Sequence, residues 1–201
     1  YDRIASPATG SGQYSLETWV VPANTTQEGP ARIVSYSNGL GSRNFTMGQT
    51  LYQYVFRNRS VDLAINNNGS PELITYDVDQ DLQSALQHVV MTFDPINGRR
   101  IYVDGVFTDD IDLQGGGLLW NWDASHRFIL GNETSLNRPW LGQLRFVAMY
   151  DRALTPDQIR QNHLAGVGKR LSLAFDISQW AGPGSSIEVA VTQLDDKSYL
   201  F

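Results

Sequence analysis

Short apolar runs broken by turn-forming residues are the feature that most limits what this chain can fold into. The runs at residues 14–22, 32–37 and 87–93 (YSLETWVVP, RIVSYS and QHVVMTF) are rich in β-branched and aromatic residues. Segments such as SNGLGSR, DPING and QGGG separate runs of this kind. Because short strands alternate with turn segments along the chain, the pattern predicts an all-β, two-sheet antiparallel sandwich of the jelly-roll type.

Side-chain alternation indicates which residues of the predicted strands are buried. Leu16 and Val20 share one face of the strand at 14–22, and Trp19 lies on the other, so we expect both faces to be partly covered. Asp104-Gly105 between apolar residues predicts a tight hairpin turn. A further run places three aromatic side chains at strand spacing, which we expect on the core face: Tyr52, Tyr54 and Phe56.

One helix is predicted after residue 155, where the spacing of apolar residues changes from that of a strand to that of a helix. Thr155 suits the N-cap, a proline follows it, and Gln158 completes a capping box. The helix should run over about 156–164 and pack Ile159 and Leu164 against the sandwich, because so short a helix is marginal alone. Beyond it, the runs LSLAFDI and IEVAVTQL alternate as strands do.

Composition limits the classes of partner. The 201 residues fit one domain, 1–201, and the formal charge of −6 disfavours nucleic acid or an anionic membrane as partner. There is no cysteine, so disulfides and a thiolate metal site are excluded. The three histidines are too few to favour a histidine-rich zinc site. No apolar run suits membrane insertion, and the start YDRIASPATGSGQ does not have the pattern of a signal peptide. We expect the chain to be a piece of a larger protein.

The segments HVVMTFDPINGRRIYVDGVF, FILGNE and WLGQLRFVAMYDRALTPDQI resemble the laminin-G-like, concanavalin A-like jelly-roll domains of large secreted and surface proteins. The resemblance covers about residues 13–165. It implies a two-sheet antiparallel sandwich, a concave face that often binds sugars, and usually no catalysis. The family commonly carries an acidic pair after the glycine of its G-x-I-D-E motif, whereas Arg145 and Phe146 stand here. The role of that pair, including help at a metal site, is therefore not implied.

YDVDQD is the candidate for catalysis. If this segment is a strand, Asp77, Asp79 and Asp81 project from one face, and paired carboxylates about 5 Å apart are what retaining glycoside hydrolysis requires. The favoured interpretation is a solvated acidic loop, with calcium binding as a further alternative. An EF-hand is excluded, since the sixth position lacks glycine and His88 stands where a glutamate is needed.

TDDID is the candidate for a metal. Asp109, Asp110 and Asp112 could hold a structural calcium ion, because hard cations take clustered carboxylates from loops. Solvation of the three aspartates at the surface is the favoured interpretation. The histidines do not form a spaced ligand set, and no serine lies in a nucleophile elbow, so a hydrolase triad is unsupported.

GGGLLWNWDASHR is the candidate for ligand binding. Trp120 and Trp122 would share a face if the segment is extended, and indole rings suit stacking on sugar rings. The polar neighbours available to bond sugar hydroxyls are Asn121, Asp123 and Arg127. Tryptophan is, however, most often a packing residue, so packing in the core or anchoring of the loop is the favoured interpretation of the tryptophans themselves.

We therefore expect a non-catalytic recognition module, extracellular or in the cell envelope, within a secreted or surface protein. Its partner is expected to be a glycan or an extracellular protein, besides other domains of the parent chain. One alternative is a glycoside hydrolase or polysaccharide lyase that uses the Asp77, Asp79 and Asp81 cluster. Another is a structural or adhesion spacer.

Overall fold

The computed structural model describes residues 5–61, 72–113 and 116–167. By contacts the chain divides into two units, Tyr1–Arg170 and Leu171–Phe201, and all described residues belong to the first. The predicted strands at 171–177 and 187–194, and most of the apolar run VDLAI, lie outside the described residues. The prediction of one domain over 1–201 therefore stays a prediction.

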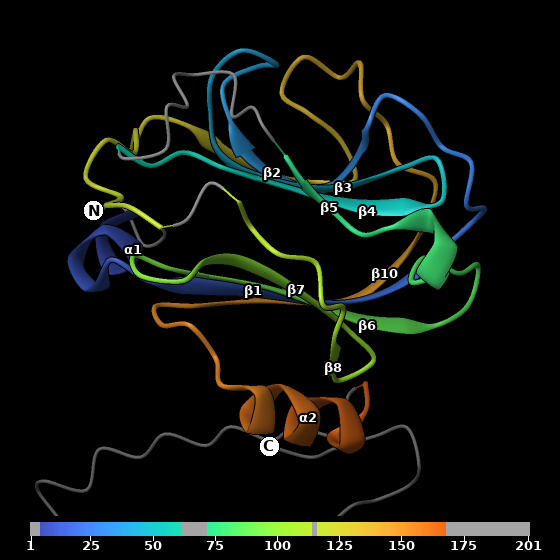
Figure 1. Ribbon diagram of the computed structural model, residues 1–201. Helices are drawn as coiled ribbons and strands as arrows, with labels where there is room; N and C mark the ends of the chain where they lie inside the picture. Colours follow the sequence, from blue (N-terminus) through green and yellow to red (C-terminus); the bar gives the residue numbers. More distant parts are fainter. Residues whose placement is uncertain (1–4, 62–71, 114–115, 168–201) are drawn as a thin grey trace, which may run out of the picture. The chain divides into compact units, whose positions relative to one another are not determined.

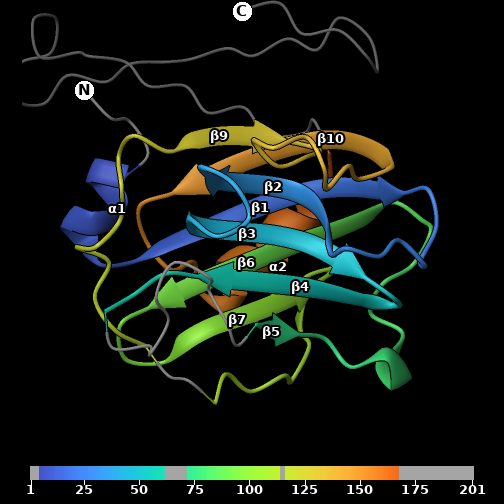
Figure 2. The same cartoon turned by 90° about the horizontal axis from the view of Figure 1, so that it is seen from above.

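Two five-stranded antiparallel sheets face each other (Figures 1 and 2). Sheet A has the order β10-β1-β6-β7-β8 and sheet B the order β5-β4-β3-β2-β9. The strands of sheet A are β1 (Tyr14–Pro22), β6 (Gln87–Asp94), β7 (Gly98–Val103), β8 (Val106–Phe107) and β10 (Gly142–Tyr150). Those of sheet B are β2 (Ala31–Ser37), β3 (Arg43–Thr50), β4 (Gln53–Asn58), β5 (Leu73–Ile74) and β9 (Arg127–Leu130). The predicted fold class is confirmed.

The main core lies between the sheets and is rich in aromatic rings. Leu16 and Val20 belong to it, as the alternation in β1 predicts. Tyr54 and Phe56 are buried as predicted, but Tyr52 is half exposed. The prediction for Tyr52 is wrong because this residue precedes β4, in a turn that takes its side chain out of the strand alternation.

Besides the two-residue strand β5 and the 3-10 turn at Asp77–Asp79, two elements were not predicted from the sequence. Strand β3 was not predicted, although Phe45 and Met47 alternate with Asn44 and Thr46 as in a strand; all four side chains are buried. Helix α1 (Ala5–Ser11) contains proline, glycine and serines, which are weak helix formers. Its two alanines, Ala5 and Ala8, pack in the core, and such tertiary packing stabilises a helix that is too short to be stable alone.

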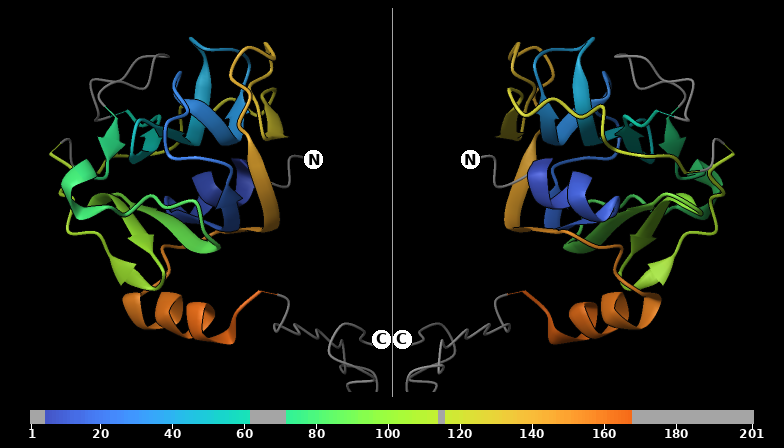
Figure 3. Two further views of the ribbon diagram at one scale, coloured as in Figure 1. Left: turned by 90° about the vertical axis from the view of Figure 1, so that its right-hand side faces the viewer. Right: turned by 90° about the vertical axis from the view of Figure 1, so that its left-hand side faces the viewer.

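Helix α2 (Pro156–Ala165) covers the outer face of sheet A (Figures 1 and 3). The capping box is confirmed: the Gln158 N–H donates to Thr155 Oγ1 at 3.3 Å, and the Thr155 N–H donates to Gln158 Oε1 at 3.0 Å. Ile159 is fully buried, but Leu164 is 71% exposed, so its predicted packing is wrong. Ile159 and Leu164 are five positions apart, which places their side chains about 140° apart around the helix axis. The two side chains therefore cannot face the same surface.

A buried polar cluster joins α2 to sheet A. Glu17 Oε1 lies 2.7 Å from His88 Nε2, and both side chains are fully buried. Asn162 of α2 donates to Glu17 Oε2 at 3.1 Å. The Trp19 ring stacks on the rings of His88 and His163, with centroids 4.8 and 5.7 Å apart. Both faces of β1 are therefore covered, as expected.

The hairpin at Asp104-Gly105 is also confirmed. The φ angles of the two residues are 50° and 83°, which matches a primed turn between β7 and β8. Its register pairs Val103 with Val106. Neither helix of the described part of the chain is long and apolar enough to cross a membrane.

Candidate functional site

The two tryptophans of the predicted binding loop have different environments. Trp122 is 8% exposed, and its ring centroid lies 5.0 Å from that of Tyr14 and 5.8 Å from that of Phe45. Trp120 is 71% exposed. The two do not share a face, because the segment is not a strand: the Trp122 N–H donates to the Leu119 carbonyl in a turn. The prediction of ligand contact for Trp122 is wrong, and the residue belongs to the core.

The loop that carries Trp120 has a fixed base. The Asn44 side chain donates to the Asp123 carbonyl at 2.9 Å and accepts from the Asp123 N–H at 2.8 Å. Trp122 Nε1–H donates to the Arg59 carbonyl at 2.8 Å. Hydrogen bonds from Ser125 lower the pKa of the Asp123 carboxyl, so it stays ionised. On the other side of Trp120, the Val61 N–H donates to the Leu118 carbonyl at 3.0 Å, so the loop is anchored on both sides of the position that presents the indole.

The other predicted contact residues lie around this base. Asn121 is partly exposed, and Asp123 and Arg127 are exposed. Arg127 begins β9, where it pairs with Ser37 of β2. These residues are thus available to solvent on the same segment as Trp120.

The carboxylates of YDVDQD do not line a strand. Asp77–Asp79 forms a single 3-10 turn, labelled η1, so the predicted same-face arrangement is wrong. Burial raises the pKa of Asp81 to about 6, and the nearby charges of Asp110 and Asp79 act in the same direction. The fold thus brings Asp81 and Asp110 near each other from separate segments.

The aspartates of TDDID have separate environments. Asp112 forms a buried pair with Arg99, in which Nε and Nη2 donate to the two carboxylate oxygens at 2.7 and 2.8 Å. Asp110 is 2% exposed, and burial raises its pKa. Asp109 is exposed. Among the described residues, no three acidic or histidine side chains converge to hold a metal ion, and Asp112 is paired with Arg99, so the predicted grouping of Asp109, Asp110 and Asp112 is wrong, whereas calcium binding itself stays a prediction.

Sequence reasoning missed Arg99, although strand alternation identifies it. Ile101 and Val103 of β7 face the core, and Arg99 has the same parity. A charged residue on the core face needs a buried partner, because an unpaired buried charge is costly. That partner is Asp112.

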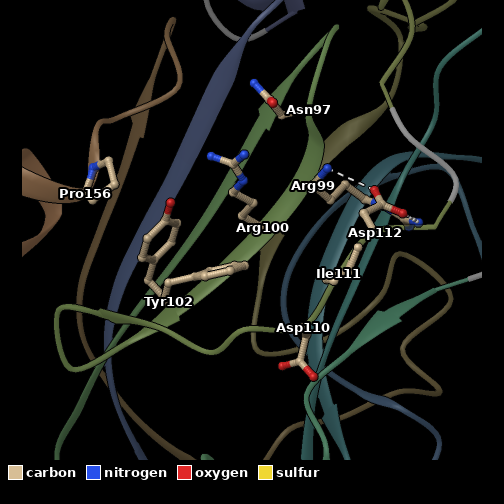
Figure 4. A pocket seen from close by; sticks show the side chains of 9 residues that line it. Asn97, Arg99, Arg100, Tyr102, Asp110, Ile111, Asp112 and Pro156 are labelled. Carbon is tan, nitrogen blue, oxygen red and sulfur yellow. Dashed lines mark hydrogen bonds and ion pairs between the residues drawn. The ribbon is translucent and has the colours of Figure 1, made fainter.

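A pocket of about 380 Å³ lies at the β8 edge of sheet A (Figure 4). The Arg99–Asp112 pair forms part of its wall, and the guanidinium of Arg100 lies 6.0 Å from the Phe107 ring centroid. Its lining residues are Asn97, Arg99, Arg100, Tyr102, Phe107, Asp110, Ile111, Asp112 and Pro156. The positive charge of Arg99 is already paired with the Asp112 carboxylate, so Arg99 does not offer that charge to an anion in this pocket.

The polar residues of β2 that face away from the core are covered. Arg32 is 3% exposed and lies 3.8 Å from the carboxylate of Glu133, which follows β9. Burial, with the charges of Arg43 and Arg57, lowers the pKa of Arg32 to about 10. Ser35 and Ser37 are fully buried, so these side chains are not presented to a ligand in this conformation.

Solved structures similar to this chain include carbohydrate-binding and receptor-binding domains of low sequence identity. A carbohydrate-binding domain of a Ruminococcus gnavus sialidase, bound to sialyllactose, has a TM-score of 0.58 at 14% identity; the match covers 78% of this chain and 86% of that one. A pentraxin from Limulus polyphemus has a TM-score of 0.55 at 14% identity, with coverages of 79% and 73%. These likenesses show the fold alone.

Other similar structures are much longer than this chain. A receptor-binding domain matches with a TM-score of 0.57 at 14% identity, over 82% of this chain and 38% of that one. The chain thus spans less than half of that protein. No curated protein matches it in sequence.

The jelly-roll topology and the sequence agree on the family. Residues 2–160 match the family described as the concanavalin A-like lectin/glucanases superfamily. This range contains both sheets, the anchored Trp120 loop and the start of α2. The chain belongs to the concanavalin A-like lectin/glucanase superfamily.

Proposed function

We propose that this chain is a non-catalytic carbohydrate-recognition module that binds a glycan through the loop carrying Trp120. The observation that carries the proposal is an indole 71% exposed on a loop whose neighbouring residues are fixed. A rigid, exposed aromatic ring suits stacking on a sugar, because little conformational entropy is lost on binding.

Similar folds support a glycan as the ligand class. The Ruminococcus gnavus domain is bound to sialyllactose, and a Trypanosoma rangeli sialidase of related fold is in complex with sialic acid. A botulinum neurotoxin binding domain of this fold is in complex with synaptotagmin II, which makes an extracellular protein the alternative partner. We infer that the parent protein acts outside the cell or in its envelope.

A glycan-binding screen of the 201-residue chain tests the proposal. Trp120→Ala should weaken binding about fivefold or more, since truncating a contacting aromatic costs about 1 kcal/mol or more. Leu136→Ala is the matched control, because Leu136 is 72% exposed on a different loop and should not matter. Unchanged binding by Trp120→Ala would remove the loop as the site. Silence of the wild-type chain on all glycans would favour a structural spacer.

A second candidate function is glycoside hydrolysis. Asp81 favours it, because a carboxyl with a pKa of about 6 is suited to general acid catalysis. Sensitive product assays on neutral and acidic polysaccharides test this candidate. If the wild-type chain cleaves a polysaccharide and Asp81→Asn does not, the function is catalysis and not recognition alone.

A further inference from the structure

An open pocket of about 450 Å³ lies at the other end of the sandwich from the Trp120 loop. Strand β3 connects the two regions: it begins beside Asn44, which bonds the Trp120 loop, and ends at Thr50, beside Tyr52. The β1–β2 loop, the β3–β4 turn and the segment between η1 and β6 line the pocket. These three segments lie on the right in Figure 1. Its lining residues are Thr25, Tyr52, Gln80, Leu82, Gln83 and Ser84.

The lining matches the surface of a sugar. Tyr52 is 50% exposed and supplies an aromatic face, and Leu82 is buried at the pocket wall. The remaining lining residues carry amides and hydroxyls, which both donate and accept hydrogen bonds as sugar hydroxyls do. Of the described residues, none that lines the pocket is charged, so a neutral ligand fits better than an acidic one. The volume is that of a small-ligand site, for which about 300–1,000 Å³ is usual.

A buried glutamine fixes one wall of the pocket from inside. Gln87 is 2% exposed, and its Oε1 accepts from the Gln83 N–H and from the Tyr54 hydroxyl, each at 2.8 Å. Its Nε2 donates to the Asp81 carbonyl at 2.7 Å. The segment that carries Gln80, Gln83 and Ser84 is therefore held at two points by the core.

A second buried glutamine fixes the opposite wall. Gln49 is fully buried, donates to the Asn24 carbonyl at 2.9 Å, and accepts from Trp140 Nε1–H at 2.7 Å. The Tyr52 N–H donates to the Thr25 carbonyl at 2.7 Å, which joins this wall to the β3–β4 turn. The pocket is thus formed before a ligand arrives, which reduces the entropy lost on binding.

Two lining residues adopt a backbone conformation that is unfavourable for their type. Tyr52 has φ 60° and Gln80 has φ 55°, in the left-handed region where glycine is the favoured residue. Glycine at either position would avoid this cost. The side chains therefore supply something that the fold alone does not require, as is typical of binding sites.

We propose that this pocket is a second saccharide-binding site, which takes a neutral sugar unit stacked on Tyr52 and hydrogen-bonded by Gln80, Gln83, Thr25 and Ser84. The site does not depend on the Trp120 loop. Two sites at opposite ends of the sandwich would let one module contact two parts of a glycan or two glycan chains.

Titration of the isotope-labelled 201-residue chain with neutral trisaccharides, observed by NMR, tests the proposal. The probes are the malto-, cello-, xylo- and manno-trioses, used up to about 10 mM so that even a millimolar Kd is detected. We expect at least one of them to shift the backbone amides of Tyr52, Gln83 and Ser84. If no trisaccharide shifts these amides, the proposal is overturned.

Variants separate a ligand contact from a structural role. Tyr52→Ala should raise the Kd about fivefold or more, whereas Tyr76→Ala should not, since Tyr76 is 60% exposed outside this pocket. Tyr52→Gly should weaken binding equally without lowering the melting temperature, because glycine accepts the φ of this position. An unchanged Kd in both Tyr52 variants would overturn the proposal.

Trp120→Ala distinguishes this site from the proposed function. It should leave the amide shifts of the Tyr52 pocket intact while it weakens binding in the glycan screen. Loss of the pocket shifts in Trp120→Ala, with the fold intact, would show that the pocket is not an independent site.

Discussion

Replacing Trp122 by alanine is expected to destabilise the fold strongly, whereas the same change at Trp120 is not. Trp122 is 8% exposed and its ring lies against those of Tyr14, Tyr36 and Phe45. Truncation of a buried tryptophan to alanine costs about 3–5 kcal/mol. Loss of the hydrogen bond to the Arg59 carbonyl adds about 1 kcal/mol.

The expected difference in melting temperature is large. For a domain of this size, 1 kcal/mol corresponds to about 2–4 °C, so Trp122→Ala should melt roughly 10–20 °C below the wild type. Trp120 is 71% exposed, and its truncation should change the free energy of unfolding by no more than about 0.5 kcal/mol. Trp122→Phe keeps a ring but removes the N–H donor, so it should fall between these values.

Thermal unfolding followed by circular dichroism and calorimetry measures these shifts. Glycan binding is then measured for the same proteins. Of the two alanine variants, only Trp120→Ala should weaken glycan binding while the melting temperature is unchanged. Equal melting temperatures for the two alanine variants, or a larger loss in Trp120→Ala, would refute the assignment of Trp122 to the core and Trp120 to the ligand.

Four further predictions follow from the capping box and the aspartates. Thr155→Ala should lower the free energy of unfolding by about 1 kcal/mol and speed amide exchange in the first turn of α2, and unaltered exchange would contradict the role of the cap. Asp112→Ala should lower the free energy of unfolding, measured by chemical denaturation, by about 3–5 kcal/mol, because Arg99 loses its buried partner. An equal loss of stability in Asp109→Ala, which changes an exposed aspartate, would argue against that reason. The folded pKa of Asp81, about 6, lies above its ordinary 3.8, so the folded state binds more protons between these values, and the contribution of Asp81 to stability should fall as pH rises from about 4 to 6. Urea unfolding of wild type and Asp81→Asn across this range isolates that contribution, and parallel pH profiles would contradict it. Calcium binding stays a prediction from the sequence: it should raise the melting temperature over that in chelator, and identical curves would exclude it.

Local patterns in the sequence were sufficient for the elements that short-range forces determine. The capping box at Thr155 and the turn at Asp104-Gly105 form as predicted, because their hydrogen bonds and φ angles involve residues within a few positions of each other. The strands with clear alternation, such as β1 and β6, also form where expected, since the pattern reports which face is buried.

Tertiary contacts decided which side chains are available for chemistry. Trp120 and Trp122 are two positions apart, and only packing against Tyr14 and Phe45 makes one a core residue and leaves the other exposed. The partner of Asp112 lies thirteen residues before it, on the core face of β7. Burial and pairing depend on residues distant in the sequence, so local pattern alone does not determine them.

The pocket at Tyr52 is the extreme case of this dependence. Its walls come from three loops, and the glutamines that hold them, Gln49 and Gln87, lie on different sheets. Gln87 lies close in sequence to the wall that it supports, but Gln49 lies 25 residues from Asn24 in the opposite wall, so no short window of sequence contains the whole pocket. The sequence by itself determined the strands and the capped helix, whereas the closure of the sandwich brought these loops together, because only then do residues from separate strands meet at one end.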